Sequence, residues 1–160
     1  MTEPAKLGTQ AIGAAGELLV QYQLIKRGID SARLTTDSGI DLVMYLPGTT
    51  EAHTVQVKAR FQTESAGGKG HRTMGWSFPE DCKAQWLAGV DLSRDLVWLF
   101  RIEEACELAQ QRRADGGMTL YWYLEDSPRR RIPGLETDFD AYRLDAVVTR
   151  MFVDESETLS

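Results

Sequence analysis

Two runs of apolar and β-branched residues, 40–46 and 54–61, stand out along the chain. Pro47, Gly48 and the residues after them separate the runs, a pattern that predicts the two strands of a hairpin. Side chains alternate across a strand, so each face of the hairpin has its own composition. The face expected in the core carries Ile40, Leu42, Met44, Leu46, Val55, Val57, Ala59 and Phe61. The opposite face carries Asp41, Val43, Tyr45, Thr54, Gln56, Lys58 and Arg60.

The register of this hairpin decides which polar side chains meet. If Leu46 lies opposite His53, Asp41 falls opposite Lys58, and Gln56 is the diagonal neighbour on the same face. Directly opposed residues lie about 5 Å apart and diagonal ones about 7 Å. An acid, an amide and an amine are therefore predicted to converge at the end of the hairpin far from its turn.

The remaining pattern predicts one α/β domain over residues 1–160, with a core at about 9–102, an extension at 103–145 and an acidic tail at 146–160. Helices are expected over 9–27, 79–89, 103–115 and 139–145, and further strands over 31–36, 74–78, 95–102 and 118–124. The glycine-rich segment 63–73 reads as a mobile loop. Four tryptophans lie in apolar surroundings and are expected in the core: Trp76, Trp86, Trp98 and Trp122.

The first helix is the most clearly amphipathic. Thr9 is its expected N-cap, and Gly28 is the expected residue just past its end. At 100° per residue, one stripe is apolar and expected to face the core: Ile12, Ala15, Leu18, Leu19, Tyr22 and Ile25. A narrow polar stripe on its shoulder contains Glu17.

Composition narrows the class of protein. Apolar residues make up 42% and charged residues 26%, as in soluble globular proteins. No apolar run approaches the roughly 20 residues that span a bilayer, and no signal peptide is evident, so no membrane partner is expected. Cys82 and Cys106 are expected in helices as reduced thiols of a cytoplasmic protein, because they lack the spacing of a zinc site.

Charge is distributed unevenly. The net charge is −6, yet residues 53–75 carry four cations against Glu64 alone. One basic side on an acidic body is compatible with a nucleic-acid partner. The candidates for contact with its backbone are Arg60 on the polar face of the hairpin and, in the glycine-rich loop, Lys69, His71 and Arg72. For the loop residues, a solvent-exposed loop without such a role is an equally good interpretation.

The order of the polar residues has a further meaning. Glu17 follows Gly16 in the first helix, Asp41 lies within D-S-G-I-D-L, and Gln56-Val57-Lys58 forms Q-V-K on the next strand. This order resembles the PD-(D/E)XK nuclease superfamily, whose restriction-endonuclease-like fold occurs in restriction enzymes, Holliday-junction resolvases and repair nucleases. The resemblance covers residues 9–102 approximately. It implies an αβββαβ core, a central mixed sheet flanked by helices, with the C-terminal helix and strand as an extension.

The resemblance also implies a reaction and roles. The protein would be a metal-dependent endonuclease that hydrolyses DNA and leaves a 5′-phosphate, acting by analogy as a homodimer. Asp41, Gln56, the carbonyl of Val57 and Glu17 would hold Mg²⁺, with Mn²⁺ as a possible substitute. Lys58 would orient the attacking water or stabilise the anionic transition state. Carboxylate, amide and carbonyl oxygens are the ligands that such hard cations prefer.

Two features depart from that superfamily. Gln56 stands where Glu or Asp is usual, which leaves the site one negative charge short. In addition, Ile40 precedes Asp41, whereas the superfamily's name PD-(D/E)XK has Pro at that position. The first departure favours an alternative, a catalytically inactive nuclease-fold protein that binds nucleic acid or a protein. A third hypothesis is an unrelated α/β enzyme in which Asp41 and Lys58 form an ordinary ion pair.

Overall fold

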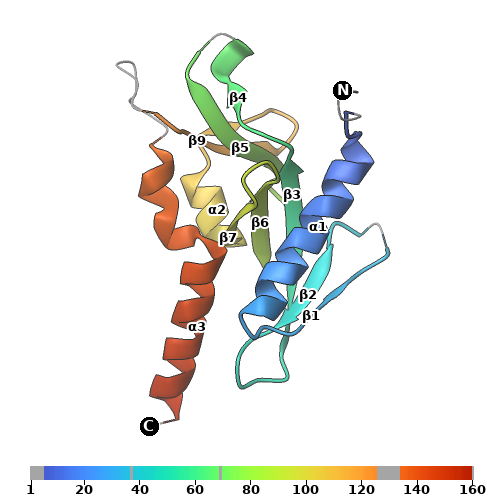
Figure 1. Cartoon of the computed structure of the whole chain (residues 1–160), viewed down its shortest axis with the longest axis vertical. Helices are drawn as coiled ribbons and strands as arrows, with labels where there is room; N and C mark the ends of the chain where they lie inside the picture. The colour runs from blue at the N-terminus through green and yellow to red at the C-terminus, as the bar shows by residue number, and fades with distance from the viewer. Residues whose placement is uncertain (1–5, 37, 69, 126–133, 160) are drawn as a thin grey trace, which may run out of the picture.

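A five-stranded mixed sheet forms the centre of the computed structural model, which describes residues 6–36, 38–68, 70–125 and 134–159. Its strands lie in the order β1 (Ser31–Arg33), β2 (Leu42–Tyr45), β3 (Ala52–Arg60), β6 (Trp86–Asp91) and β7 (Leu96–Arg101). Strands β3 and β6 run parallel, whereas the other neighbours are antiparallel. The hairpin predicted from the sequence is β2–β3, at the middle of this sheet (Figure 1).

A second, antiparallel sheet packs against the first. It consists of β4 (Glu64–Ser65), β5 (Arg72–Pro79), β9 (Gly117–Tyr123) and β8 (Gln111–Arg112), in that order. Three indole rings, Trp76, Trp98 and Trp122, meet between the sheets with centroids 5.0–5.6 Å apart. All four tryptophans are buried, as the apolar pattern predicts.

Helices complete the fold. α1 (Thr9–Lys26) and α3 (Leu144–Thr158) contribute to the apolar core on one face of the central sheet, and α2 (Ile102–Leu108) joins the core on the other. The described residues also include the 3₁₀ helices η1 (Ala66–Gly68) and η2 (Glu136–Tyr142). The predicted fold class, a central mixed sheet flanked by helices, is confirmed. None of the helices in the described ranges is long and apolar enough to cross a bilayer.

The connection between the parallel strands differs from the prediction. Residues 79–89 are not a helix: Cys82 lies in a turn, and Trp86 begins the fully buried strand β6. The segment 63–73 is likewise no simple loop, because β4 pairs with the start of β5. A short apolar run suits a buried strand or a buried helix equally, so periodicity alone does not separate them. Gly89 lets the ring of Trp76 lie close to β6, because a Cβ there would be 2.6 Å from that ring.

The first helix has nearly the predicted length but turns a different face inward. Leu18, Tyr22 and Ile25 are exposed to 52%, 59% and 54%, whereas Gly16, Val20 and Leu24 are the buried positions. Gly16 gives no apolar signal in the sequence, yet it packs tightly against Ala59 of β3. Gly8, not Thr9, is the N-cap, and no side chain caps the helix there. Gly28 has the expected left-handed conformation, with φ of 85°.

The C-terminal third also differs from its predicted boundaries. The helix expected over 103–115 ends at Leu108, and β8 follows. The range 139–145, expected as one short helix, instead covers the end of η2 and the start of α3. The residues predicted as an acidic tail form most of α3, because Val147 and Val148 are buried against the central sheet and hold the helix in place.

The close approach of α1 to β3 yields a stability prediction. A Cβ on Gly16 would lie 2.5 Å from the Cβ of Ala59, whereas a Cβ on Gly13 meets no atom within 4 Å. Alanine stabilises a helix by about 1 kcal/mol relative to glycine, and overpacking costs about 1–3 kcal/mol. Gly16→Ala is therefore expected to lower the free energy of unfolding by up to about 2 kcal/mol. Gly13→Ala, the matched control, is expected to raise it. Urea denaturation distinguishes the two, and equal effects would contradict the packing argument.

Candidate functional site

The candidate site lies where β2 begins, because the edge of β3 beyond that point is open. The two strands pair only from Leu42↔Val55 to Tyr45↔Ala52. Met44, rather than Leu46, lies opposite His53, so the register differs by two residues from the one considered in the sequence. A shift of two leaves every side chain on its predicted face. It brings Asp41, which directly precedes β2, opposite Gln56 instead of Lys58.

The carboxylate of Asp41 occupies this open edge. Its Oδ2 accepts a hydrogen bond from the backbone N–H of Val57 at 2.7 Å, while its own N–H donates to the carbonyl of Val55. The N–H and C=O of one strand residue point toward the same neighbour. The carbonyl of Val57 therefore projects from the same edge as the Asp41 carboxylate. Two of the predicted oxygen ligands lie on one side of β3.

The side-chain amide of Gln56 is held by a residue outside the hairpin, Cys82. Gln56 is 8% exposed, and its Oε1 accepts a hydrogen bond from the Cys82 thiol at 2.9 Å. Burial raises the pKa of that thiol, and Asp41 and Asp81 add to the shift, against the lowering effect of the Ala84 backbone and Lys58. The raised pKa keeps the thiol protonated at neutral pH, so it remains a donor. Sequence reasoning missed Cys82 because it placed the residue in a helix.

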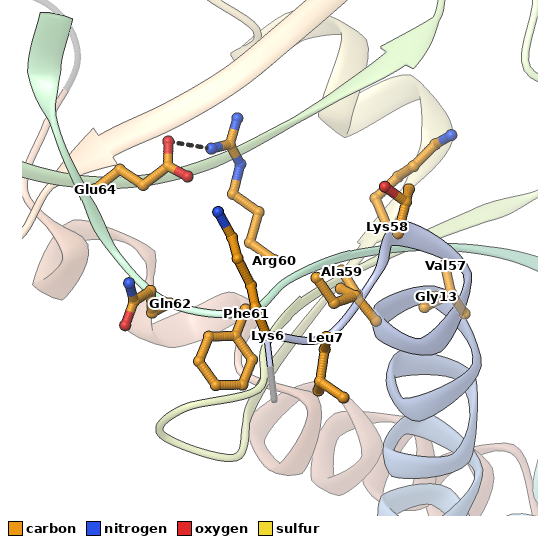
Figure 2. A pocket seen from close by; sticks show the side chains of 12 residues that line it. Lys6, Leu7, Gly13, Val57, Lys58, Ala59, Arg60, Phe61, Gln62 and Glu64 are labelled. Atoms are coloured by element: carbon orange, nitrogen blue, oxygen red, sulfur yellow. Dashed lines mark hydrogen bonds and ion pairs between the residues drawn. The ribbon is translucent and has the colours of Figure 1, made fainter. Parts of the chain in front are cut away.

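Lys58 lies two residues after Gln56 in β3, so its side chain is on the same face of the strand. It is half-buried and makes no ion pair within the described ranges, so an ordinary pair with Asp41 is not observed. Lys58 borders two cavities. One of about 770 Å³ lies between the start of α1 and the end of β3, and one of about 320 Å³ lies against Ser77 and Arg113 (Figure 2 shows the first).

Glu17 has a different environment. Both Nε and Nη2 of Arg33 on β1 donate to its Oε2, at 3.3 and 3.0 Å. Its helix packs on the face of β3 that carries Val57 and Ala59, whereas Gln56 and Lys58 point to the opposite face. Across the described residues, no three His, Cys, Asp or Glu side chains form a group that could hold a metal. The predicted ligand set contains only two residues of those types, Glu17 and Asp41.

The chemistry of the donors at the β3 edge fits a hard divalent cation. Only the Oδ2 of Asp41 takes a hydrogen bond from the part of the chain described, so Oδ1 is available as a ligand. The Oε1 of Gln56 accepts one hydrogen bond and retains a second lone pair. With the carbonyl of Val57, these are oxygen donors of the kind that Mg²⁺ takes while keeping several waters. Their role as ligands remains a prediction.

The predicted nucleic-acid contacts are dispersed. Arg60 borders the larger cavity and pairs with Glu64 at 2.7 Å. His71 lies 3.9 Å from Glu125, and the Nε–H of Arg72 donates to the Thr63 hydroxyl. Lys69 lies outside the described residues.

Comparison with solved structures identifies the fold. A bacterial homing endonuclease superposes with a TM-score of 0.62 at 14% identity, covering 95% of this chain and 99% of that one. The Holliday junction resolvase of the archaeal hyperthermophile Archaeoglobus fulgidus superposes with a TM-score of 0.51 at 13% identity, covering 86% and 95%. No family model and no curated protein matches the sequence. Both neighbours have the restriction-endonuclease-like fold, so this chain has that fold, as the resemblance implies.

Proposed function

We propose that this protein is a metal-dependent endonuclease that hydrolyses phosphodiester bonds of DNA. The observation that carries the proposal is the Asp41 carboxylate, fixed by the Val57 N–H at the open edge of β3, next to Gln56 and Lys58. A carboxylate, an amide and an amine at one strand edge do not by themselves define a reaction. Their position on a fold shared with two nucleases gives them their meaning.

Each residue has a distinct part in this proposal. Asp41, Gln56 and the Val57 carbonyl would hold Mg²⁺ or Mn²⁺, and Glu17 would contribute directly or through a water. When bound, the ion neutralises charge on the phosphate and acidifies a water. The Val57 N–H and the Cys82 thiol orient the Asp41 and Gln56 side chains. Lys58, which is not engaged in an ion pair with Asp41, would hydrogen-bond to the attacking water or to the phosphate.

The remaining parts of the proposal follow from the same reaction. Hydrolysis would leave a 5′-phosphate, and a homodimer would allow two sites to cut two strands. The two cysteines, Cys82 and Cys106, are free thiols, in keeping with a cytoplasmic location.

A cleavage assay tests the proposal. Labelled duplex, single-stranded and branched DNA would be incubated with Mg²⁺ or Mn²⁺ and with the wild type or Asp41→Ala. We expect products from the wild type that disappear in the variant. The second candidate, a binding module without catalysis, is favoured by the neutral amide of Gln56. It predicts equal DNA binding by both proteins and no cleavage by either.

Restoring the missing negative charge is expected to strengthen metal binding. Gln56→Glu adds a carboxylate beside Asp41 that still accepts the Cys82 hydrogen bond. We expect at least about ten-fold tighter Mg²⁺ binding by calorimetry, equivalent to roughly 1.4 kcal/mol. Gln62→Glu adds the same charge at an exposed position and serves as the control. Equal effects of the two substitutions would show that position 56 is not a ligand.

A further inference from the structure

A groove lies beside the candidate site, between the start of α1 and the end of β3. Its cavity of about 770 Å³ falls within the range typical of small-ligand sites. The walls are largely apolar and are formed by Leu7, Ile12, Val57, Ala59 and Phe61. Figure 2 shows the aromatic ring of Phe61 close to Leu7 and Lys6. We call this cavity the α1–β3 groove.

Phe61 is an unexpected feature of the groove. The alternation of the strand predicts a core position, yet the residue is 46% exposed. Strand β3 ends at Arg60, so the pleat that would turn Phe61 inward does not continue. Its backbone is nevertheless fixed, because its carbonyl accepts the N–H of Ser93 at 2.8 Å. The ring is thus presented to the groove from an anchored backbone, three residues beyond Lys58.

The rim of the groove is cationic. Lys6, Lys58 and Arg60 border it, against the single carboxylate of Glu64, which pairs with Arg60 at 2.7 Å. The pair is exposed, with 43% and 66% of the side chains accessible, so it holds Arg60 only weakly. On a chain with a net charge of −6, such a rim selects a polyanion over an acidic or neutral protein surface.

We propose that the α1–β3 groove binds an unpaired nucleotide of the substrate strand, with the base against Phe61 and flanking phosphates on Lys6 and Arg60. An apolar floor with an aromatic ring suits the face of a base, and a cationic rim suits its backbone. A base within a duplex is covered on both faces by its neighbours, so only an unpaired base can stack on Phe61. The inference rests on the proposed function and specifies its substrate class, DNA with a single-stranded segment beside the cut.

Binding measurements without cleavage test this inference. Fluorescence anisotropy would be recorded in Ca²⁺, under conditions where no product forms, with a labelled single strand of about 12 nucleotides, a blunt duplex of the same sequence and a gapped duplex. We expect Phe61→Ala to weaken binding of the single strand and the gapped duplex by about ten-fold, the scale of one base–aromatic stack. Binding of the blunt duplex is expected to stay unchanged. Phe61→Tyr keeps the ring and is expected to retain wild-type affinity.

One control variant and two further measurements make the result specific. Phe152→Ala removes a phenylalanine that is 39% exposed on α3, outside the groove, and is expected to leave all three affinities unchanged. Lys6→Ala is expected to reduce the salt dependence of single-strand binding by about 0.7 in the logarithmic slope. The fluorescence of a 2-aminopurine base placed in the gap is expected to be quenched by stacking when the wild type or Phe61→Tyr binds. Phe61→Ala is expected to quench this fluorescence less.

Failure of the inference is distinguishable from failure of the proposed function. If Phe61→Ala binds every probe with wild-type affinity, or if it loses as much affinity for the blunt duplex as for the other two probes, the α1–β3 groove does not bind an unpaired base. The endonuclease proposal survives that result, provided that Asp41→Ala still abolishes cleavage. If the wild type binds and cleaves none of the three DNA forms, both the inference and the proposed function are wrong.

Discussion

Replacing Lys58 by alanine is expected to slow DNA cleavage by about 10²–10³-fold, the loss typical when one donor to a developing anion is removed. The side chain is half-buried at the junction of two cavities and has no carboxylate partner in the described ranges. Its removal therefore leaves no buried charge unpaired. Metal affinity and the free energy of unfolding are expected to remain close to those of the wild type.

Single-turnover cleavage with saturating metal is the measurement for Lys58→Ala. Lys83→Ala serves as its control, because Lys83 is an exposed cation on the turn that also carries Cys82. The control is expected to cleave at the wild-type rate. Wild-type cleavage by Lys58→Ala, or an equal loss in both variants, would exclude a role for Lys58 in the chemical step.

The second large effect concerns stability and lies far from the reaction. Asp91 is fully buried at the end of β6, and its Oδ2 accepts the Nε–H of Arg94 at 2.6 Å. The two terminal nitrogens of Arg94 donate to Glu136 at 2.9 and 2.8 Å, and the indole of Trp122 donates to the same carboxylate. Burial lowers the pKa of Arg94, but Glu136 and Asp91 outweigh it, so the net shift is upward. The guanidinium ties the central sheet to η2.

Arg94→Ala is expected to lower the free energy of unfolding by about 3 kcal/mol. The variant leaves the fully buried carboxylate of Asp91 without its cation, while the partly buried Glu136 keeps its longer ion pair with Arg143 at 3.8 Å. This loss of stability is at the lower end of the range of about 3–5 kcal/mol for breaking a buried ion pair, because the Arg94 side chain is 32% exposed. Arg112→Ala breaks an exposed pair with Glu80 and is expected to cost about 0–1 kcal/mol. Urea denaturation of the two variants provides the comparison, and a loss below 1 kcal/mol for Arg94→Ala would contradict this interpretation.

The part of the candidate site on the hairpin could be predicted from the sequence because it depends on local alternation. The faces of β2 and β3 follow a period of two, so Asp41, Gln56 and Lys58 keep their predicted face although the register differs by two residues. The alternation does not fix the register itself: β2 begins at Leu42, and the carboxylate of the preceding residue, Asp41, takes the N–H of Val57.

Features set by tertiary packing could not be predicted in this way. The inward face of α1 is determined by the contact between Gly16 and Ala59, and glycine carries no apolar signal. The apolar run of β6 is equally compatible with a helix, and the sequence predicts a helix over 79–89. The turn that brings Cys82 to Gln56 lies in this range, so it could not be predicted either. Phe61 is exposed because β3 ends one residue earlier. The alternation of apolar and polar residues does not indicate at which residue a strand ends.

Calorimetric titration of Mg²⁺ and Mn²⁺ into the wild type and Asp41→Ala, with DNA cleavage measured on the same samples, is the most direct test of the endonuclease proposal. The proposal predicts that the wild type binds a divalent ion and cleaves DNA, and that Asp41→Ala loses both. Asp95→Ala removes a carboxylate from the β6–β7 turn and is the control that should lose neither. Absence of metal binding and of cleavage by the wild type at millimolar ion would contradict it, and would leave a nuclease fold that serves only for binding.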